Sequence, residues 1–196
     1  MSKVFLNYID FWENGVNWYG VQGVKNDRDM AKLIIFWNER CLCSKEIEKH
    51  FPDLCFPEAR KRIEQGEAAY IQYCWDKLIA KKDNRFGELI EMCASNPRTR
   101  RLMSYIQLRD FGLCSYIGEV NGVQYHDLPR VRITDDWEYE VRTPKMAQME
   151  YAGRKPREFL GKGNAQEAFQ ILLKNLPPGA GPARYHSGVG CCPPAA

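Results

Sequence analysis

The sequence lacks any apolar run of the length that a membrane-spanning helix needs, which is about 18 to 20 residues. Its longest candidate, residues 32–37, has only the length of a strand. The first residues also lack the positive and then apolar layout of a secretion signal. We therefore expect a soluble protein without membrane association that works in a reducing compartment, the cytoplasm or the nucleus.

The chain also lacks a strong excess of either charge. Among its 196 residues, 28 lysines and arginines oppose 25 acidic residues, which gives a formal net charge of +3. This charge is too small to indicate a nucleic-acid partner by itself. The basic excess is local, in residues 58–110. With only three histidines, the chain has little material for a metal site or a nucleophile with its base.

The cysteines, eight in all, do not indicate a disulfide framework. Cys74, Cys93 and Cys114 fall in periodic apolar segments, where a free cysteine packs as a small hydrophobic residue. We predict that these thiols are reduced.

One group of residues has the chemistry of zinc ligands within a short stretch: Cys41, Cys43, His50 and Cys55. Its spacing does not match the paired, short-spaced knuckles of structural zinc sites. We therefore predict no metal and no other cofactor, and these four residues are the candidate ligands if zinc does bind.

The first half of the chain predicts a β-meander followed by helices. Aromatic and β-branched residues on either side of a turn at Glu13-Asn14-Gly15 are typical of strands, and a helical apolar period begins after Ser44. The strands are predicted over residues 4–12, 16–24 and 30–37. The helices are predicted over residues 45–51, 58–82 with an interruption at Gly66, 85–94, and from Pro97 onward with Asn96 as the cap.

The second half predicts two hairpins and a final helix. Asn121-Gly122 suits a two-residue hairpin turn, and alternating residues on both sides of Asp135-Asp136 indicate a second hairpin. Residues 143–163 read as a basic loop. Asn164, with Glu167 three residues later, is a capping-box signal for the last helix. Its buried face is predicted to carry Ala168, Phe169, Leu172 and Leu176.

Together these elements predict the α+β class: an antiparallel meander, central helices, a second antiparallel β unit, a C-terminal helix and a disordered tail. The predicted domains are residues 1–110, holding the meander and the helical unit, and residues 111–176, holding the hairpins and the last helix. The Pro- and Gly-rich residues 177–196 are predicted to form a flexible tail.

Basic residues gather in the central helices and in the loop, beside a meander that is rich in aromatic residues. Such a combination can hold phosphates and stack bases, although the aromatic residues fit a core equally well. The candidate nucleic-acid-binding residues are Arg60, Lys61, Arg62, Lys81, Lys82, Arg98, Arg100, Arg101, Arg154, Lys155 and Arg157.

A strand at Leu33–Trp37, a helix at Lys45–Phe51 and a later helix with Tyr73-Cys74 and Lys77 form an ordered series. In this order, residues 30–77 resemble rolling-circle replication initiators, the Rep endonucleases of small circular single-stranded DNA elements. That family carries metal-binding histidines on the strand and a nucleophilic tyrosine, followed by lysine, on the helix. The resemblance implies that Tyr73 is the nucleophile and Lys77 its companion. It also implies a viral or mobile-element accessory protein.

The match departs from the family at the metal motif, where this chain has Met30-Ala31-Lys32. Lys77 also follows Tyr73 by four residues instead of three. These departures imply a degenerate relative that kept nucleic-acid binding and lost nicking.

We therefore expect a non-enzymatic binding protein that contacts nucleic acid or a protein partner through the basic helices and the loop. A degenerate or active DNA-nicking endonuclease is one alternative, and a structural subunit of a larger assembly is another. The sequence leaves the oligomeric state open.

Overall fold

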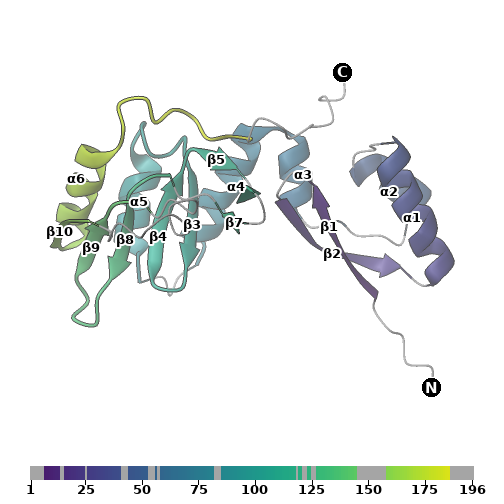
Figure 1. Ribbon diagram of the computed structural model, residues 1–196, viewed down its shortest axis with the longest axis horizontal. Helices are drawn as coiled ribbons and strands as arrows, with labels where there is room; N and C mark the ends of the chain where they lie inside the picture. Colours follow the sequence, from purple (N-terminus) through teal and green to yellow (C-terminus); the bar gives the residue numbers. More distant parts are fainter. Residues whose placement is uncertain are drawn as a thin grey trace, which may run out of the picture. The chain divides into compact units, whose positions relative to one another are not determined.

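The structure is a computed structural model in which helices and an antiparallel sheet form an α+β protein, as predicted (Figure 1). The chain divides into two compact units, Met1–Tyr70 with Ser187–Ala196, and Ile71–His186. In the described part of the chain, no helix is long and apolar enough to cross a membrane. The described residues are 7–13, 16–24, 26–40, 44–52, 56, 58–81, 85–117, 119–120, 123–124, 127–144 and 158–185.

The first unit opens with the predicted hairpin. β1 (Asn7–Glu13) and β2 (Val16–Val24) pair antiparallel, with Glu13 opposite Val16. The two strands end on either side of residues 14–15, which agrees with the predicted hairpin; these two residues lie outside the described part.

The predicted third strand is wrong, because residues 30–37 lie in helix α1 (Asp27–Arg40). The Oδ1 atom of Asn26 accepts the backbone N–H of Asp29 at 2.9 Å, so Asn26 caps the helix. Leu33 is fully buried, whereas Ile34 and Ile35 are 40% and 50% exposed. The apolar run therefore buries one helical stripe instead of two faces of a strand.

Helices follow as expected, and the one predicted over residues 58–82 is divided into two helices at Gly66. α2 (Ser44–His50) is followed by α3 (Glu58–Glu64) and α4 (Glu67–Ile79). Gly66, at φ +103°, separates the last two helices, because this left-handed conformation favours glycine. On α4 the buried residues are Ile71 and Trp75, whereas Cys74, which was expected in the apolar period of this helix, is half-buried.

The second unit contains a five-stranded antiparallel sheet in the order β10-β9-β8-β4-β3. The predicted hairpin around Asp135-Asp136 is confirmed, since the strands on both sides of it pair antiparallel. The sheet strands are β3 (Met103–Gln107), β4 (Asp110–Cys114), β8 (Arg130–Ile133), β9 (Tyr139–Arg142) and β10 (Phe159–Gly163). Outside this sheet, β6 (Glu119–Val120) pairs with β7 (Val123–Gln124) around the predicted Asn-Gly turn.

Two further predictions are corrected here. The helix expected from Pro97 is a turn that leads into β3, and the loop expected over residues 143–163 contains β10.

The predicted boundary after residue 110 falls inside β4, which pairs with β3 on one side and β8 on the other. A domain boundary there would cut the sheet.

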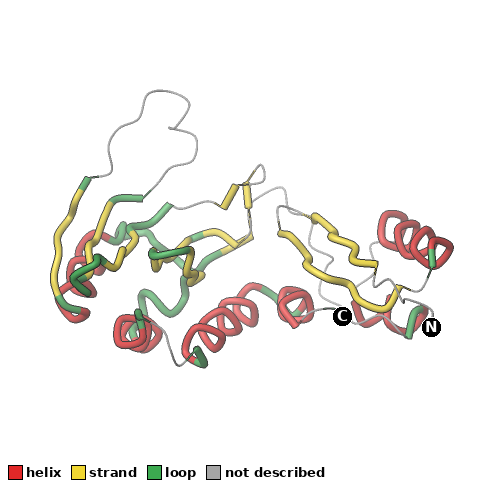
Figure 2. Tube along the Cα trace, turned by 90° about the horizontal axis from the view of Figure 1, so that it is seen from below, coloured by secondary structure: helices red, strands yellow, loops and turns green. Residues whose placement is uncertain are grey.

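Helices cover one face of this sheet. Figures 1 and 2 show α5 (Gly87–Ser95) and α6 (Ala165–Asn175) on the same side of the strands. Phe111 is fully buried on that face, where its ring lies 6.3 Å from the ring of Trp75 and 6.0 Å from that of Phe86. Val131 and Val141 are paired across β8 and β9 and are fully buried. Because side chains alternate along a strand, the charged neighbours of these valines point to the opposite face.

The last helix matches its prediction. Asn164 and Glu167 form the complete capping box, and the four predicted core residues are buried. The tail is shorter than predicted, because β11 (Arg184–Tyr185) pairs parallel with β5 (Tyr116–Ile117) and Ala183 is fully buried. Residues 186–196 lie outside the described part.

Candidate functional site

The predicted basic residues that the structure describes are divided between the two units of the chain. Lys61 and Arg62 lie in the first unit and are already paired, the former with Glu48 at 2.9 Å and the latter with Glu58 at 2.7 Å. These pairs largely neutralise the two cations. Five of the predicted basic residues have no described side chain: Arg60, Lys82, Arg154, Lys155 and Arg157.

Residues 96–102, here called the arginine turn, contain the predicted basic residues Arg98, Arg100 and Arg101, and the structure describes all of them. The Oδ1 atom of Asn96 accepts the backbone N–H of Arg98 at 2.9 Å, and the hydroxyl of Thr99 donates to the carbonyl of Cys93. Asn96 therefore caps a turn that folds back on α5, because the bond from Thr99 closes it before a helix can develop.

The backbone of the arginine turn is held by two distant segments. The indole N–H of Trp75 donates to the carbonyls of Arg100 and Leu102, at 3.1 and 3.2 Å. The backbone N–H of Ala183 donates to the carbonyl of Arg101 at 2.8 Å. Because these contacts use main-chain atoms, the side chains of Arg100 and Arg101 are left out of them.

The three arginines of this turn have different roles. The Nη1 and Nη2 atoms of Arg98 donate to the carbonyls of Leu173 and Leu176, each at 3.4 Å, so this cation caps the C-terminus of α6. Arg100 and Arg101 are exposed. Within the described residues, no carboxylate pairs with either guanidinium or with exposed Lys81 near the end of α4.

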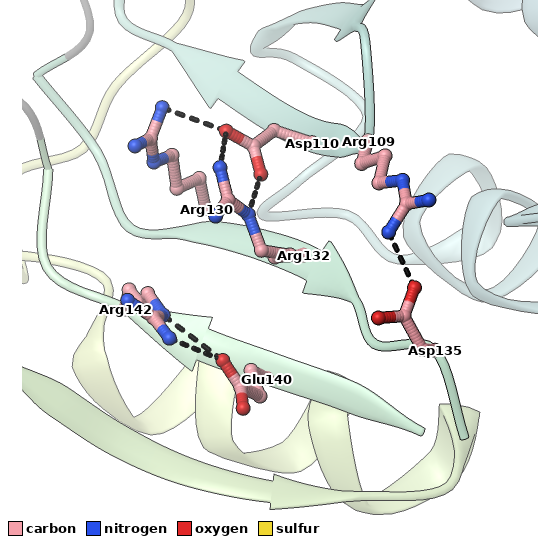
Figure 3. Close-up of polar contacts among 7 residues, drawn as sticks. All are labelled: Arg109, Asp110, Arg130, Arg132, Asp135, Glu140 and Arg142. Atoms are coloured by element: carbon pink, nitrogen blue, oxygen red, sulfur yellow. Dashed lines mark hydrogen bonds and ion pairs between the residues drawn. The ribbon is translucent and has the colours of Figure 1, made fainter. Parts of the chain in front are cut away.

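A second arginine cluster occupies the sheet face opposite the helices (Figure 3). Arg130 and Arg132 alternate with Val131 on β8, and Arg142 lies opposite Arg130 on β9. Arg142 is bonded to Glu140 through two guanidinium nitrogens.

Asp110 on β4 binds both arginines of β8. Its Oδ2 atom lies 2.9 Å from Nη1 of Arg130, and its two oxygens accept Nε and Nη2 of Arg132 at 2.8 and 3.4 Å. The hydrogen bond and the charge of Asp110 raise the pKa of Arg132 above its usual value. Arg130 is only 5% exposed, and its Nη2 atom has no hydrogen-bond partner in the described structure.

This second cluster was not among the predicted sites, although the alternation of residues 130–133 contained a signal for it. The apolar residues of Arg130-Val131-Arg132-Ile133 predicted the strand, and the same alternation places both arginines together on the other face. The carboxylate they share comes from a strand about twenty residues earlier, so no local pattern could show the pairing.

Tyr73 and Lys77, the two residues of the endonuclease resemblance, contact each other on α4. Tyr73 is half-buried, and the Nζ atom of Lys77, one helical turn later, lies 5.6 Å from the centre of its ring. This is a cation–π contact between neighbours on one helix. The strand that the resemblance places at Leu33–Trp37 is part of α1.

The zinc hypothesis rests on residues that are mostly outside the described part. Cys41, Cys43 and Cys55 are not described, and the ring of His50 lies 4.9 Å from that of Phe36. Among the residues that are described, no three potential metal ligands come together.

The three cysteines predicted to be reduced are free: Cys74, Cys93 and Cys114. Cys93 and Cys114 are fully buried, and this burial raises the pKa of both thiols far above its usual value. They are therefore core residues without nucleophilic character at neutral pH.

Comparisons of the chain with protein families, with characterised proteins and with solved structures find no match.

Proposed function

We propose that this protein binds nucleic acid without enzymatic activity, and that Arg100 and Arg101 of the arginine turn contact the phosphates. The observation that supports the proposal is the exposure of both guanidiniums on an anchored backbone, with no carboxylate partner among the described residues.

The chemistry of arginine favours a phosphate ligand here. The planar guanidinium donates in a fork that fits phosphate oxygens. The backbone of the turn is already ordered by Trp75 and Ala183, so binding has to order little more than the two side chains. Lys81 adds a further exposed cation in the same unit.

The test is a fluorescence-anisotropy titration of labelled single-stranded DNA, single-stranded RNA and duplex DNA. We expect the double variant Arg100→Ala/Arg101→Ala to bind at least about tenfold more weakly than wild type, since each charge-assisted hydrogen bond contributes about 1.5–3 kcal/mol. The fold should persist, because the anchoring bonds use the backbone carbonyls of these residues.

A matched control removes two positive charges elsewhere. Lys61→Ala/Arg62→Ala deletes cations that carboxylates already neutralise, and we expect its affinity to stay within about twofold of wild type. Equal losses in both double variants would show a nonspecific charge effect and contradict the proposed role of the turn.

The endonuclease alternative depends on Tyr73 and predicts a different product. A covalent adduct between Tyr73 and single-stranded DNA, formed with Mg²⁺ or Mn²⁺, would decide for nicking and against a protein that only binds. The contact of Lys77 with Tyr73 is a cation–π contact within one helix and does not require a role in catalysis.

A further inference from the structure

The cluster around Asp110 carries one more positive than negative charge. Arg130, Arg132 and Arg142 bring three positive charges, whereas Asp110 and Glu140 supply two negative charges. The side chain of Arg132 is 42% exposed. The side chains of Arg130 and Asp110 are only 6% and 10% exposed. Burying a charge costs free energy unless it is compensated, so the excess at Arg130 favours an additional anion.

The geometry leaves a donor for that anion. Arg130 uses Nη1 for Asp110, and its Nη2 atom has no partner among the described residues. In Figure 3 this second nitrogen points away from Asp110. A buried donor without an acceptor costs free energy, which a bound oxyanion would recover.

The neighbouring strand adds a second guanidinium. Arg142 lies directly opposite Arg130 in the strand pairing, and its described bonds reach a single oxygen of Glu140. Next to Arg130 on the other side is Gly112, over which the ring of Tyr105 packs. Both arginines stand on the charged face of the sheet, each with its own carboxylate partner, and guanidinium donors fit phosphate oxygens.

We propose that Arg130 holds a phosphate-class oxyanion through Nη2 on the charged face of the sheet, as free phosphate or as part of a phosphorylated ligand. The site uses none of residues 96–102, so it does not rest on the proposed function.

Inorganic phosphate is the probe for this site. The melting temperature of the full chain is measured against phosphate concentration, with sodium chloride adjusted to hold the ionic strength constant. We expect a saturable rise, because a ligand that binds only the folded state stabilises it. An unchanged melting temperature, or an equal rise with acetate, would overturn the proposal. This is the result expected if a water molecule satisfies Nη2.

Arg130→Lys tests the residue itself. Lysine keeps the positive charge and loses the fork of donors, so we expect phosphate affinity to fall at least about tenfold. The matched control is Arg109→Lys, which alters an exposed pair with Asp135 at the end of the same sheet and should bind phosphate as wild type does. Unchanged affinity in Arg130→Lys would overturn the assignment.

Wild-type protein gives a measurement that does not depend on the variant folding. In ¹⁵N spectra of arginine side chains, phosphate should shift and slow the Nη signals of Arg130, and absence of any shift would contradict the site. A short single-stranded oligonucleotide is titrated in parallel. A shift with phosphate alone identifies a free-anion site, whereas a shift with both identifies the phosphate of a nucleic acid.

Discussion

At the scale of single residues, Gly112 shows how closely the charged face is packed. It stands between Tyr105 and Arg130 in the sheet register, and the ring of Tyr105 lies where a side chain at position 112 would begin. Tyr105 is only 9% exposed, so its ring has little room to move away. The glycine is thus required by the neighbouring ring and not by an unusual backbone angle.

Gly112→Ala should therefore lower the free energy of unfolding, by about 1–3 kcal/mol for an overpacked position. Urea unfolding followed by circular dichroism measures the change. Gly87→Ala is the matched control, because a methyl group at the start of α5 meets no atom within 4 Å, and alanine favours the helix by about 0.5–1 kcal/mol. If both variants unfolded at the same urea concentration, the packing of Tyr105 on Gly112 would be refuted.

At the scale of elements, the capping box of α6 is a feature whose sequence signal and structure agree. Asn164 accepts the N–H of Glu167 at 3.0 Å, and Glu167 accepts the N–H of Asn164 at 2.9 Å. The box also occupies the N-terminus of α6, next to the glycines of β10. Arg98 completes the helix at its other end.

Asn164→Ala should cost about 0.5–2 kcal/mol of stability, since the alanine leaves an N–H of the first turn without its acceptor. Thermal unfolding gives the comparison. Glu167→Gln is the control, because glutamine serves in a capping box as glutamate does and should change the stability far less. A larger loss in the glutamine variant than in the alanine variant would argue against the box.

The elements that the sequence predicted correctly carry their signals locally. The hairpin at β1 and β2, the hairpin at β8 and β9 and the box at Asn164 each depend on neighbouring residues. The helix α1 was missed because its apolar run, residues 32–37, has the composition of a strand. Tertiary packing buries Leu33 and leaves Ile34 and Ile35 exposed. The turn after Asn96 was missed because Thr99 bonds back to α5.

The candidate sites also combine features with a local sequence signal and features that only the tertiary fold determines. Arg98, Arg100 and Arg101 could be found from the sequence as a cluster, yet the capping role of Arg98 depends on α6, more than 70 residues away. The cluster around Asp110 depends on which strands are neighbours in the sheet. Such neighbours are set by the whole fold, so the sequence pattern gives the faces of the strands but not the shared carboxylate.

At the scale of the whole molecule, the two units divide the predicted basic surface. Lys61 and Arg62 belong to the first unit, whereas the arginine turn, Lys81 and the charged sheet face belong to the second. Within the second unit, buried Cys93 and Cys114 contribute to one core with the sheet.

These two thiols predict a loss of stability at alkaline pH. Burial raises the pKa of both in the folded state, so their stabilising effect is complete below pH 9.0, the ordinary thiol value, and declines as pH rises above it. Each thiol should contribute a slope of about 1.4 kcal/mol per pH unit. Urea unfolding in reductant between pH 8 and 11 measures it, and Cys93→Ala should show a shallower slope than wild type. Identical slopes would contradict the burial of Cys93.

The most direct test of the central claim is the salt dependence of nucleic-acid binding. Each phosphate that a cation neutralises on a single strand contributes about −0.7 to the slope of log affinity against log salt. We expect a steep slope for wild type and a slope shallower by about 1.4 for Arg100→Ala/Arg101→Ala, which removes two such contacts. A wild-type affinity that does not change with salt, or a double variant with the wild-type slope, would contradict the role of the arginine turn in binding phosphate.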